Sequence, residues 1–109
     1  MKIKNRNKKI GYIGWFLVWL KDKDKHIVVK QENNNVYIWR KETTIGVFVD
    51  YLKRKIFSYY LCQLGNNIDN FTNDELIKEI DEFTDDIMKM FVEKDCKLVL
   101  NISDYKFEL

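Results

Sequence analysis

The sequence predicts a small α+β domain, in which an antiparallel sheet of about four or five strands carries two α-helices packed on one face. Two observations predict this class. The N-terminal half holds runs of β-branched and aromatic residues separated by polar turns, and the C-terminal half holds an amphipathic helix with a capping signature. The apolar content of 46% is enough for one core, and no glycine- or serine-rich linker interrupts the chain. Residues 1–109 are therefore expected to form a single domain.

The first forty residues contain three predicted strands. Ile10–Leu20 is the strongest candidate, and because both of its alternating sets of side chains are apolar, it should be a central strand covered on both faces. The alternating charges of residues 21–25 predict a solvated turn, after which His26–Gln31 is the second strand. Three asparagines at 33–35 predict another turn, because asparagine tolerates a left-handed backbone, and Val36–Arg40 is the third strand.

The segment 43–49 is ambiguous between strand and helix. Its β-branched residues at every second position favour a fourth strand, with Asp50 capping the helix that follows. A helix that begins at Thr44 is the alternative, because it would gather an apolar stripe. That stripe would consist of Ile45, Phe48, Leu52 and Ile56. We favour strand followed by helix; in both cases Tyr51–Leu64 is helical and Gly65 ends the helix.

The clearest helix follows Thr72, which forms a capping-box sequence with Glu75. Apolar residues then recur at helical spacing and should form one face towards the core. They are Leu76, Ile77, Ile80, Phe83, Ile87, Met90 and Phe91. Lys97–Ile102 is predicted to be the last strand.

The N-terminus resembles the start of a secretory signal, with a basic stretch followed by an apolar run. No cleavage site of small residues follows, and the run is shorter than the roughly 20 residues that span a bilayer. We therefore expect a cytoplasmic protein that does not enter a membrane. Cys62 and Cys96 lie in apolar runs and are expected to be buried as small hydrophobic residues rather than paired in a disulfide.

Charge is distributed unevenly along the chain, although the formal net charge is only +2. Residues 1–58 contain 14 Lys and Arg against 5 Asp and Glu, whereas residues 59–109 contain 5 against 12. Such asymmetry is typical of proteins with charged partners, unless the two halves neutralise each other in the fold. A polarised molecule could also pair with a second copy, so a homodimer is a further candidate.

The leading candidate for a binding surface is the outer face of the C-terminal helix. An exposed ridge of carboxylates can occupy a cationic groove built for nucleic-acid phosphates. The candidate protein-binding residues are Asp74, Glu75, Glu79, Glu82, Asp85, Asp86 and Glu93. An ordinary amphipathic helix with a solvated face is the alternative interpretation.

The second candidate is a nucleic-acid interface in the basic N-terminal half. Aromatic side chains beside cations on a sheet bind single strands by stacking and phosphate pairing. Trp15 and Trp19 could share that face, although large aromatic residues usually pack in cores. The candidate residues are Lys4, Arg6, Lys8, Lys9, Lys30, Tyr37, Trp39, Arg40 and Lys41. Residues 1–9 are also a candidate flexible basic arm.

No catalytic, cofactor or metal site is predicted. His26 is the only histidine, which excludes a zinc site with several histidines, and no glycine-rich phosphate-binding loop occurs. We therefore expect a non-enzymatic binding protein. The frequent Lys, Asn and Ile, with no Ala or Pro, indicate an AT-rich genome. The expected function is that of an accessory or inhibitor protein of a phage or mobile element, which docks on a host protein such as a nucleic-acid-processing or defence enzyme.

Overall fold

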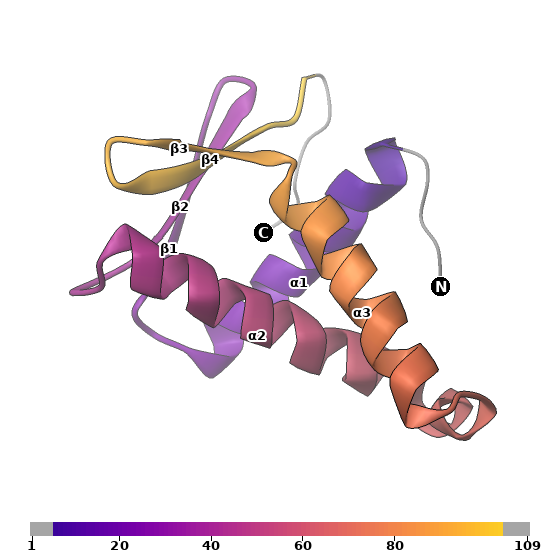
Figure 1. The fold of residues 1–109 in the computed structure, drawn as a ribbon. Coiled ribbons are helices and arrows are strands. Elements are labelled where there is room, and N and C mark those ends of the chain that lie inside the picture. Colours follow the sequence, from indigo (N-terminus) through magenta and orange to yellow (C-terminus); the bar gives the residue numbers. More distant parts are fainter. Residues whose placement is uncertain (1–5, 104–109) are drawn as a thin grey trace.

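Three α-helices and a four-stranded antiparallel sheet make up residues 6–103, the part of the chain that the computed structural model describes (Figure 1). The elements are α1 (Arg6–Lys23), β1 (Ile27–Glu32), β2 (Asn35–Arg40), α2 (Ile45–Leu64), a 3-10 helix (Gly65–Asn70), α3 (Asn73–Met88), β3 (Phe91–Lys94) and β4 (Lys97–Asn101). The α+β class and the antiparallel sheet are thus confirmed, with one helix more than expected.

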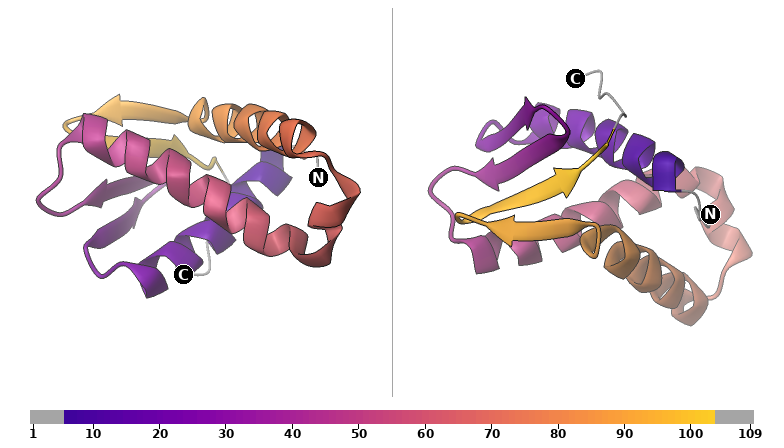
Figure 2. Two further views of the ribbon diagram at one scale, coloured as in Figure 1. Left: turned by 60° about the horizontal axis from the view of Figure 1, so that its bottom comes forward. Right: turned by 90° about the horizontal axis from the view of Figure 1, so that it is seen from above.

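The sheet joins two hairpins in the order β1-β2-β4-β3. Strands β2 and β4 pair at its centre, with Val36 opposite Leu100 and Ile38 opposite Leu98. These four side chains are buried, and α2 lies across their face of the sheet (Figure 2). Within residues 6–103 no helix covers the opposite face, which the right-hand view of Figure 2 shows.

The strand prediction for Ile10–Leu20 is wrong, because these residues form the middle of the 18-residue helix α1. One side of the helix is buried in the core. Its buried residues are Ile10, Tyr12, Ile13, Phe16, Leu17 and Leu20. An apolar run without polar interruptions fits a helix that is apolar all round as well as a central strand, so periodicity alone could not separate them. The run's length of 11 residues favours a helix, since most strands have 4–8 residues.

The strand prediction for 43–49 is also wrong, and the alternative helix is correct. Helix α2 begins at Ile45 with Thr44 in the N-cap position, so Asp50 lies inside the helix. Phe48, Leu52 and Ile56 are buried on one stripe, and this packing outweighs the strand propensity of the β-branched residues. Gly65 ends α2 as expected, with a left-handed φ of 53°.

The second, third and last predicted strands correspond to β1, β2 and β4 within one residue at each end, but the sequence does not predict β3. The helix predicted to include Met90 and Phe91 ends at Met88. The β3–β4 turn places Asp95 and Cys96 at φ of 53° and 62° without a glycine, so it has no recognisable turn sequence.

Both cysteines are exposed, which contradicts their predicted burial. Cys96 stands in the β3–β4 turn, and Cys62 lies on the solvent side of α2, away from the buried stripe. Residues 1–5 of the predicted arm lie outside the described residues, whereas residues 6–9 form the first turn of α1. Among the described residues, no helix is long and apolar enough to cross a membrane.

Asp24 connects the end of α1 to β2 and α2. One of its carboxylate oxygens accepts a hydrogen bond from Arg40 Nε at 2.7 Å and another from Tyr51 Oη at 2.5 Å. The second oxygen accepts the backbone N–H of His26 at 2.9 Å. Burial raises the pKa of Asp24, but the bonds from Tyr51, Arg40 and His26 lower it more, to about 2.

Thr84 is buried on the inner side of α3, and its Oγ1 has no hydrogen-bond partner within the described residues. The Tyr12 hydroxyl is unsatisfied in the same way, and burial raises the pKa of Tyr12, together with the nearby Tyr59 and Tyr60. An unsatisfied buried hydroxyl costs about 1–3 kcal/mol. The core therefore contains polar groups that do not contribute to its stability.

Asp24→Asn should lower the free energy of unfolding by about 2 kcal/mol at neutral pH, because the pKa shift of the carboxyl equals the stability that its ionised form contributes. That contribution is present above the ordinary pKa of 3.8 and is lost as the pH falls towards the folded-state pKa of about 2. Urea unfolding of both proteins from neutral pH down to about pH 2 tests this. A stability difference that does not change with pH would contradict it.

Thr84→Val should raise the free energy of unfolding by about 1 kcal/mol, because valine keeps the shape and removes the unsatisfied hydroxyl. Thr43→Val is the matched control. Thr43 Oγ1 accepts from Arg40 and donates to the Lys41 carbonyl, both at 3.0 Å, so its loss should be destabilising. Urea denaturation measures both, and a destabilised Thr84→Val would show that this hydroxyl has a partner.

Candidate interaction surfaces

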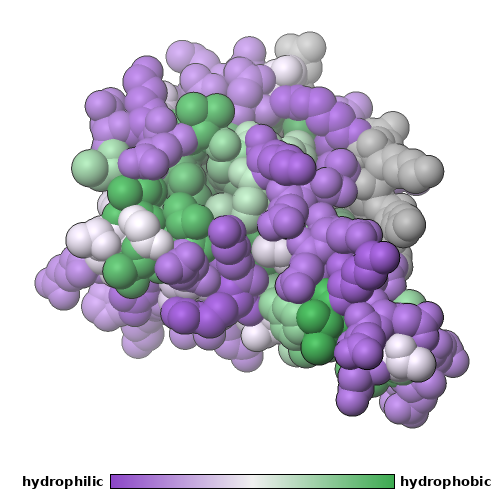
Figure 3. Space-filling model, viewed as in Figure 1, coloured by the Kyte–Doolittle hydropathy of each residue, from purple (hydrophilic) through white to green (hydrophobic). Residues whose placement is uncertain are grey.

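The exposed face of α3 carries carboxylates on two flanks. Helical periodicity places Glu75, Glu82 and Asp86 on one flank, which we call the outer flank. It places Asp74, Asp81 and Asp85 on the other, which we call the α2 flank. All six are exposed, and most of the visible surface of α3 is hydrophilic in Figure 3. Lys78 and Lys89 lie between the flanks, so the predicted anionic ridge is interrupted by two cations.

The capping box of α3 is confirmed. Thr72 Oγ1 accepts the backbone N–H of Glu75, and the Glu75 carboxylate accepts the backbone N–H of Thr72, both at 3.2 Å. The side-chain hydroxyl and then the backbone N–H of Thr72 lower the pKa of the Glu75 carboxyl. They hold this carboxylate at the positive end of the helix, where an anion is most favourable.

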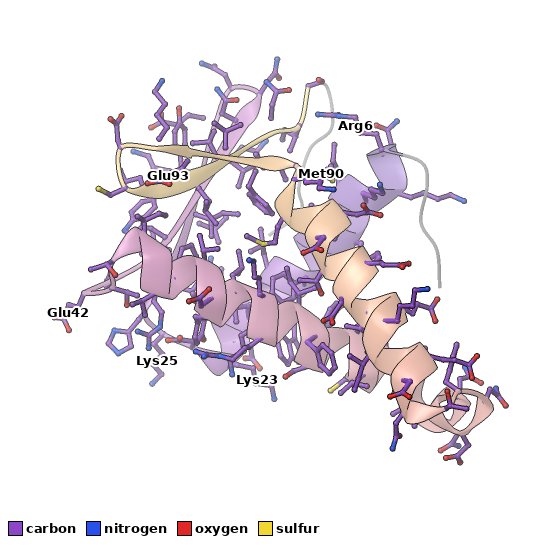
Figure 4. The ribbon with its side chains drawn as sticks, viewed as in Figure 1. Arg6, Lys23, Lys25, Glu42, Met90 and Glu93 are labelled. Carbon is purple, nitrogen blue, oxygen red and sulfur yellow. The ribbon has the colours of Figure 1, made fainter. Side chains whose placement is uncertain are left out.

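Two of the predicted protein-binding residues do not belong to the exposed carboxylate surface. Glu79 is half-buried and hydrogen-bonds Tyr60; burial, then the charge of Glu79 and this bond, raise the pKa of Tyr60 to about 12. Glu93 lies on β3, well away from α3 (Figure 4). The structure therefore brings together Asp74, Glu75, Glu82, Asp85 and Asp86 and leaves the other two apart.

A groove of about 590 Å³ separates α3 from α2. Its α2 wall has Lys53, Arg54, Phe57 and Ser58, and its α3 wall has Asp81, Thr84 and Asp85. Cations of the N-terminal half thus face carboxylates of the C-terminal half, although none of these four charged groups forms an ion pair within residues 6–103. The charge asymmetry is partly neutralised on the α2 flank and persists on the outer flank.

The candidate nucleic-acid residues are divided among several elements. Tyr37, Trp39 and Lys30 point to the uncovered face of the sheet, because they alternate with the buried residues of β1 and β2. There Lys97 Nζ lies 4.5 Å from the centre of the Trp39 ring, and Lys30 pairs with Glu32 at 2.9 Å. This face is thus aromatic and cationic.

The remaining candidates do not join that face. Arg40 is bound to Asp24, and Lys41 lies in the turn after β2. Lys4 is outside the described residues, while Lys8 and Lys9 lie in the first turn of α1 beside Arg6, which donates a hydrogen bond to the Asn101 carbonyl.

Trp15 and Trp19 lie on α1 and not on the sheet. Trp19 packs with Phe16 and Tyr59 at the edge of the core, with ring centres 6.0 and 5.2 Å away. Trp15 is 72% exposed, the highest value among the exposed large apolar residues described. The strand prediction does not indicate this exposed surface. Helical spacing separates Trp15 from the buried residues around it, whereas the alternation of a strand does not.

The histidine and the two cysteines lie on separate elements. His26 precedes β1, Cys62 is near the end of α2, and Cys96 is in the β3–β4 turn. In the part of the chain that the structure describes, no three His, Cys, Asp or Glu side chains are grouped to hold a metal ion.

Known proteins supply no further assignment for these surfaces. The chain matches no model of a protein family, no curated protein and no solved structure.

Proposed function

We propose that this chain is a small non-enzymatic binding protein that docks on a protein partner through the carboxylates of α3. The observation that carries the proposal is the outer flank, where Glu75, Glu82 and Asp86 are exposed and have no ion-pair partner among residues 6–103. Carboxylates on one side of a helix form a rigid anionic surface, which favours encounter with a cationic partner.

The composition of the chain supports a finer form of the proposal. A protein from an AT-rich phage or mobile element would meet the host's nucleic-acid-processing and defence enzymes in the cytoplasm. These enzymes hold phosphates in cationic grooves, which an anionic helix can occupy as an inhibitor. The host enzyme is therefore the partner that we propose.

A double charge reversal, Glu82→Lys with Asp86→Lys, should weaken partner capture by about tenfold or more, because like charges then face each other across the interface. Tagged wild type and variant are compared in pull-downs from bacterial extract at low and high ionic strength, and wild-type capture should fall as salt rises. Glu42→Lys with Glu93→Lys is the matched control, since it makes the same change in net charge at exposed sites away from α3. Equal capture by both double variants would rule out α3 as the docking surface.

A second candidate function is single-strand nucleic-acid binding on the uncovered sheet face. Tyr37, Trp39 and Lys97 favour it, because stacking and phosphate pairing need aromatic and cationic groups side by side. Against it, Arg40 is engaged by Asp24 and the two tryptophans of α1 are elsewhere.

Titration with an oligothymidylate decides between the two functions. If the sheet binds nucleic acid, tryptophan fluorescence should be quenched in a salt-sensitive manner, and Trp39→Ala should weaken binding by roughly tenfold or more, since one stacked base contributes about 1–3 kcal/mol. Trp15→Ala is the control and should bind like the wild type. No quenching in the wild type would remove this second candidate.

A further inference from the structure

The groove between α2 and α3 has opposite charges on its two walls. Lys53 and Arg54 stand on the α2 wall, and Asp81 and Asp85 stand on the α3 wall. No nitrogen of the two cationic side chains lies within 4.0 Å of an oxygen of the two carboxylates, so no ion pair closes the groove. All four residues are exposed, and their charges are therefore available to a ligand that enters the groove.

The groove has the size of a small-molecule site. The 3-10 helix joins α2 and α3 at one end, and the two helices diverge from it (Figure 1). The groove lies between the middle of α2 and the second half of α3 and measures about 590 Å³. Sites for small molecules usually measure about 300–1,000 Å³, a range that includes ligands of the size of a short peptide.

Thr84 adds an unpaired hydrogen-bonding group to the groove. It is the one buried residue among those that line the groove, with 6% of its surface exposed, and its Oγ1 has no hydrogen-bond partner within the described residues. A buried hydroxyl without a partner is uncommon in native proteins and is often explained by a ligand or a function that uses it. Threonine in a helix occupies two χ1 rotamers, so rotation about χ1 can turn the hydroxyl towards a molecule bound in the groove.

We propose that this groove binds a small zwitterion, namely a short peptide with a free ammonium group and a free carboxylate. The ligand's carboxylate lies against Lys53 and Arg54, its ammonium group lies against Asp81 and Asp85, and a peptide group between them bonds the Thr84 hydroxyl. A ligand with both charges is attracted by both walls. A simple anion or a simple cation is attracted by one wall and repelled by the other, which gives the groove its selectivity.

The other lining residues suit the middle of such a ligand. Phe57 is half-buried on the α2 wall and offers an apolar surface to the side chains of a peptide. Ser58 and Thr84 offer one hydroxyl from each wall to its peptide groups. The carboxylates of the outer flank lie on the other side of α3, so peptide binding in the groove is independent of docking through that flank.

Titration of the isotope-labelled full chain with trialanine, followed by NMR, tests the proposal. Both ends of trialanine are charged at neutral pH, because a terminal carboxyl titrates at about 3.3–3.7 and a terminal amine at about 7.7–8.0. We expect saturable shifts of the amide signals of the groove residues, with a dissociation constant in the millimolar range because exposed ion pairs are weak.

Two blocked forms of the peptide are the ligand controls. N-acetyl-trialanine lacks the ammonium group and trialanine amide lacks the carboxylate, and each should bind roughly fivefold or more weakly than trialanine, the effect of one exposed ion pair at the upper end of its range. A wild-type chain that shows no saturable shift with trialanine overturns the proposal. Equal binding of the three peptides overturns it as well.

Removal of the carboxylates on the α3 wall assigns the ammonium end of the ligand. Asp81→Asn with Asp85→Asn should bind trialanine no better than its N-acetyl form, because nothing then distinguishes the free ammonium group. Glu42→Gln with Glu93→Gln is the matched control, since it removes the same charge at exposed sites away from the groove and should bind like the wild type. An aspartate variant that keeps the wild-type preference contradicts the proposal.

The α2 wall is tested in the same way. Lys53→Gln with Arg54→Gln should remove the preference for trialanine over its amide. Inorganic phosphate is added separately to the wild type. Phosphate that shifts the same amide signals at lower concentrations than trialanine does would show an anion site formed by the two cations alone, and would overturn the binding of a zwitterion.

Thr84 separates ligand binding from stability. Thr84→Val should be more stable than the wild type without ligand and should nevertheless bind trialanine more weakly, because it lacks the hydroxyl that the ligand uses. Thr84→Ser keeps the hydroxyl and should keep the affinity. Urea unfolding and the NMR titration measure the two properties on each variant. A Thr84→Val chain that binds trialanine as tightly as the wild type contradicts the proposal.

Discussion

The fold depends on one carboxylate. Asp24 directly follows α1, Arg40 is the last residue of β2, and Tyr51 is in the second turn of α2, so three separate elements meet at one side chain. Only 11% of the Asp24 side chain is exposed. A buried charge is costly unless charged or hydroxyl donors satisfy it, and here both oxygens are satisfied. The interaction therefore ties the first hairpin to α1 and α2.

This constraint also limits what the basic half of the chain can bind. Arg40 appears in the sequence as one of several cations beside aromatic residues, but its guanidinium is bound to Asp24 and lies 5.1 Å from the centre of the Tyr51 ring. The uncovered face of the sheet carries the cations Lys30, Lys94 and Lys97, of which Lys30 is paired with Glu32. The docking proposal for α3 is affected less, because the carboxylates of the outer flank take no part in holding the elements together.

Features that depend on a few neighbouring residues could be predicted from the sequence. The capping box needs only the groups of Thr72 and Glu75, and the stop at Gly65 needs only one left-handed residue. The periodicity of Ile10–Leu20 does not separate a strand from a helix, because an apolar run is compatible with any element that is largely covered, and only its length favours a helix. The sequence does not predict the turn at Asp95 and Cys96, since neither residue type indicates a left-handed backbone as strongly as glycine does.

In the candidate site, too, some features can be predicted from the sequence and others depend on how the elements pack. The exposure of Glu82 and Asp86 follows from helical spacing alone, whereas the bond between Glu79 and Tyr60 depends on how α2 packs against α3. The same packing sets Lys53 and Arg54 opposite Asp81, which a count of charges in each half of the chain cannot anticipate. Net charge along a sequence is a property of segments, and their arrangement in space decides which charges face solvent and which face each other.

The exposed side chains of α3 and α1 differ in physical character. The outer-flank carboxylates of α3 are exposed charges, so their attraction to a partner acts at long range and is screened by salt. Trp15 and Val18 of α1 are exposed apolar side chains, and removing them from water would contribute a short-range free energy that depends on apolar area. The strength of the first kind of contact therefore changes with ionic strength, whereas that of the second depends on the area it buries.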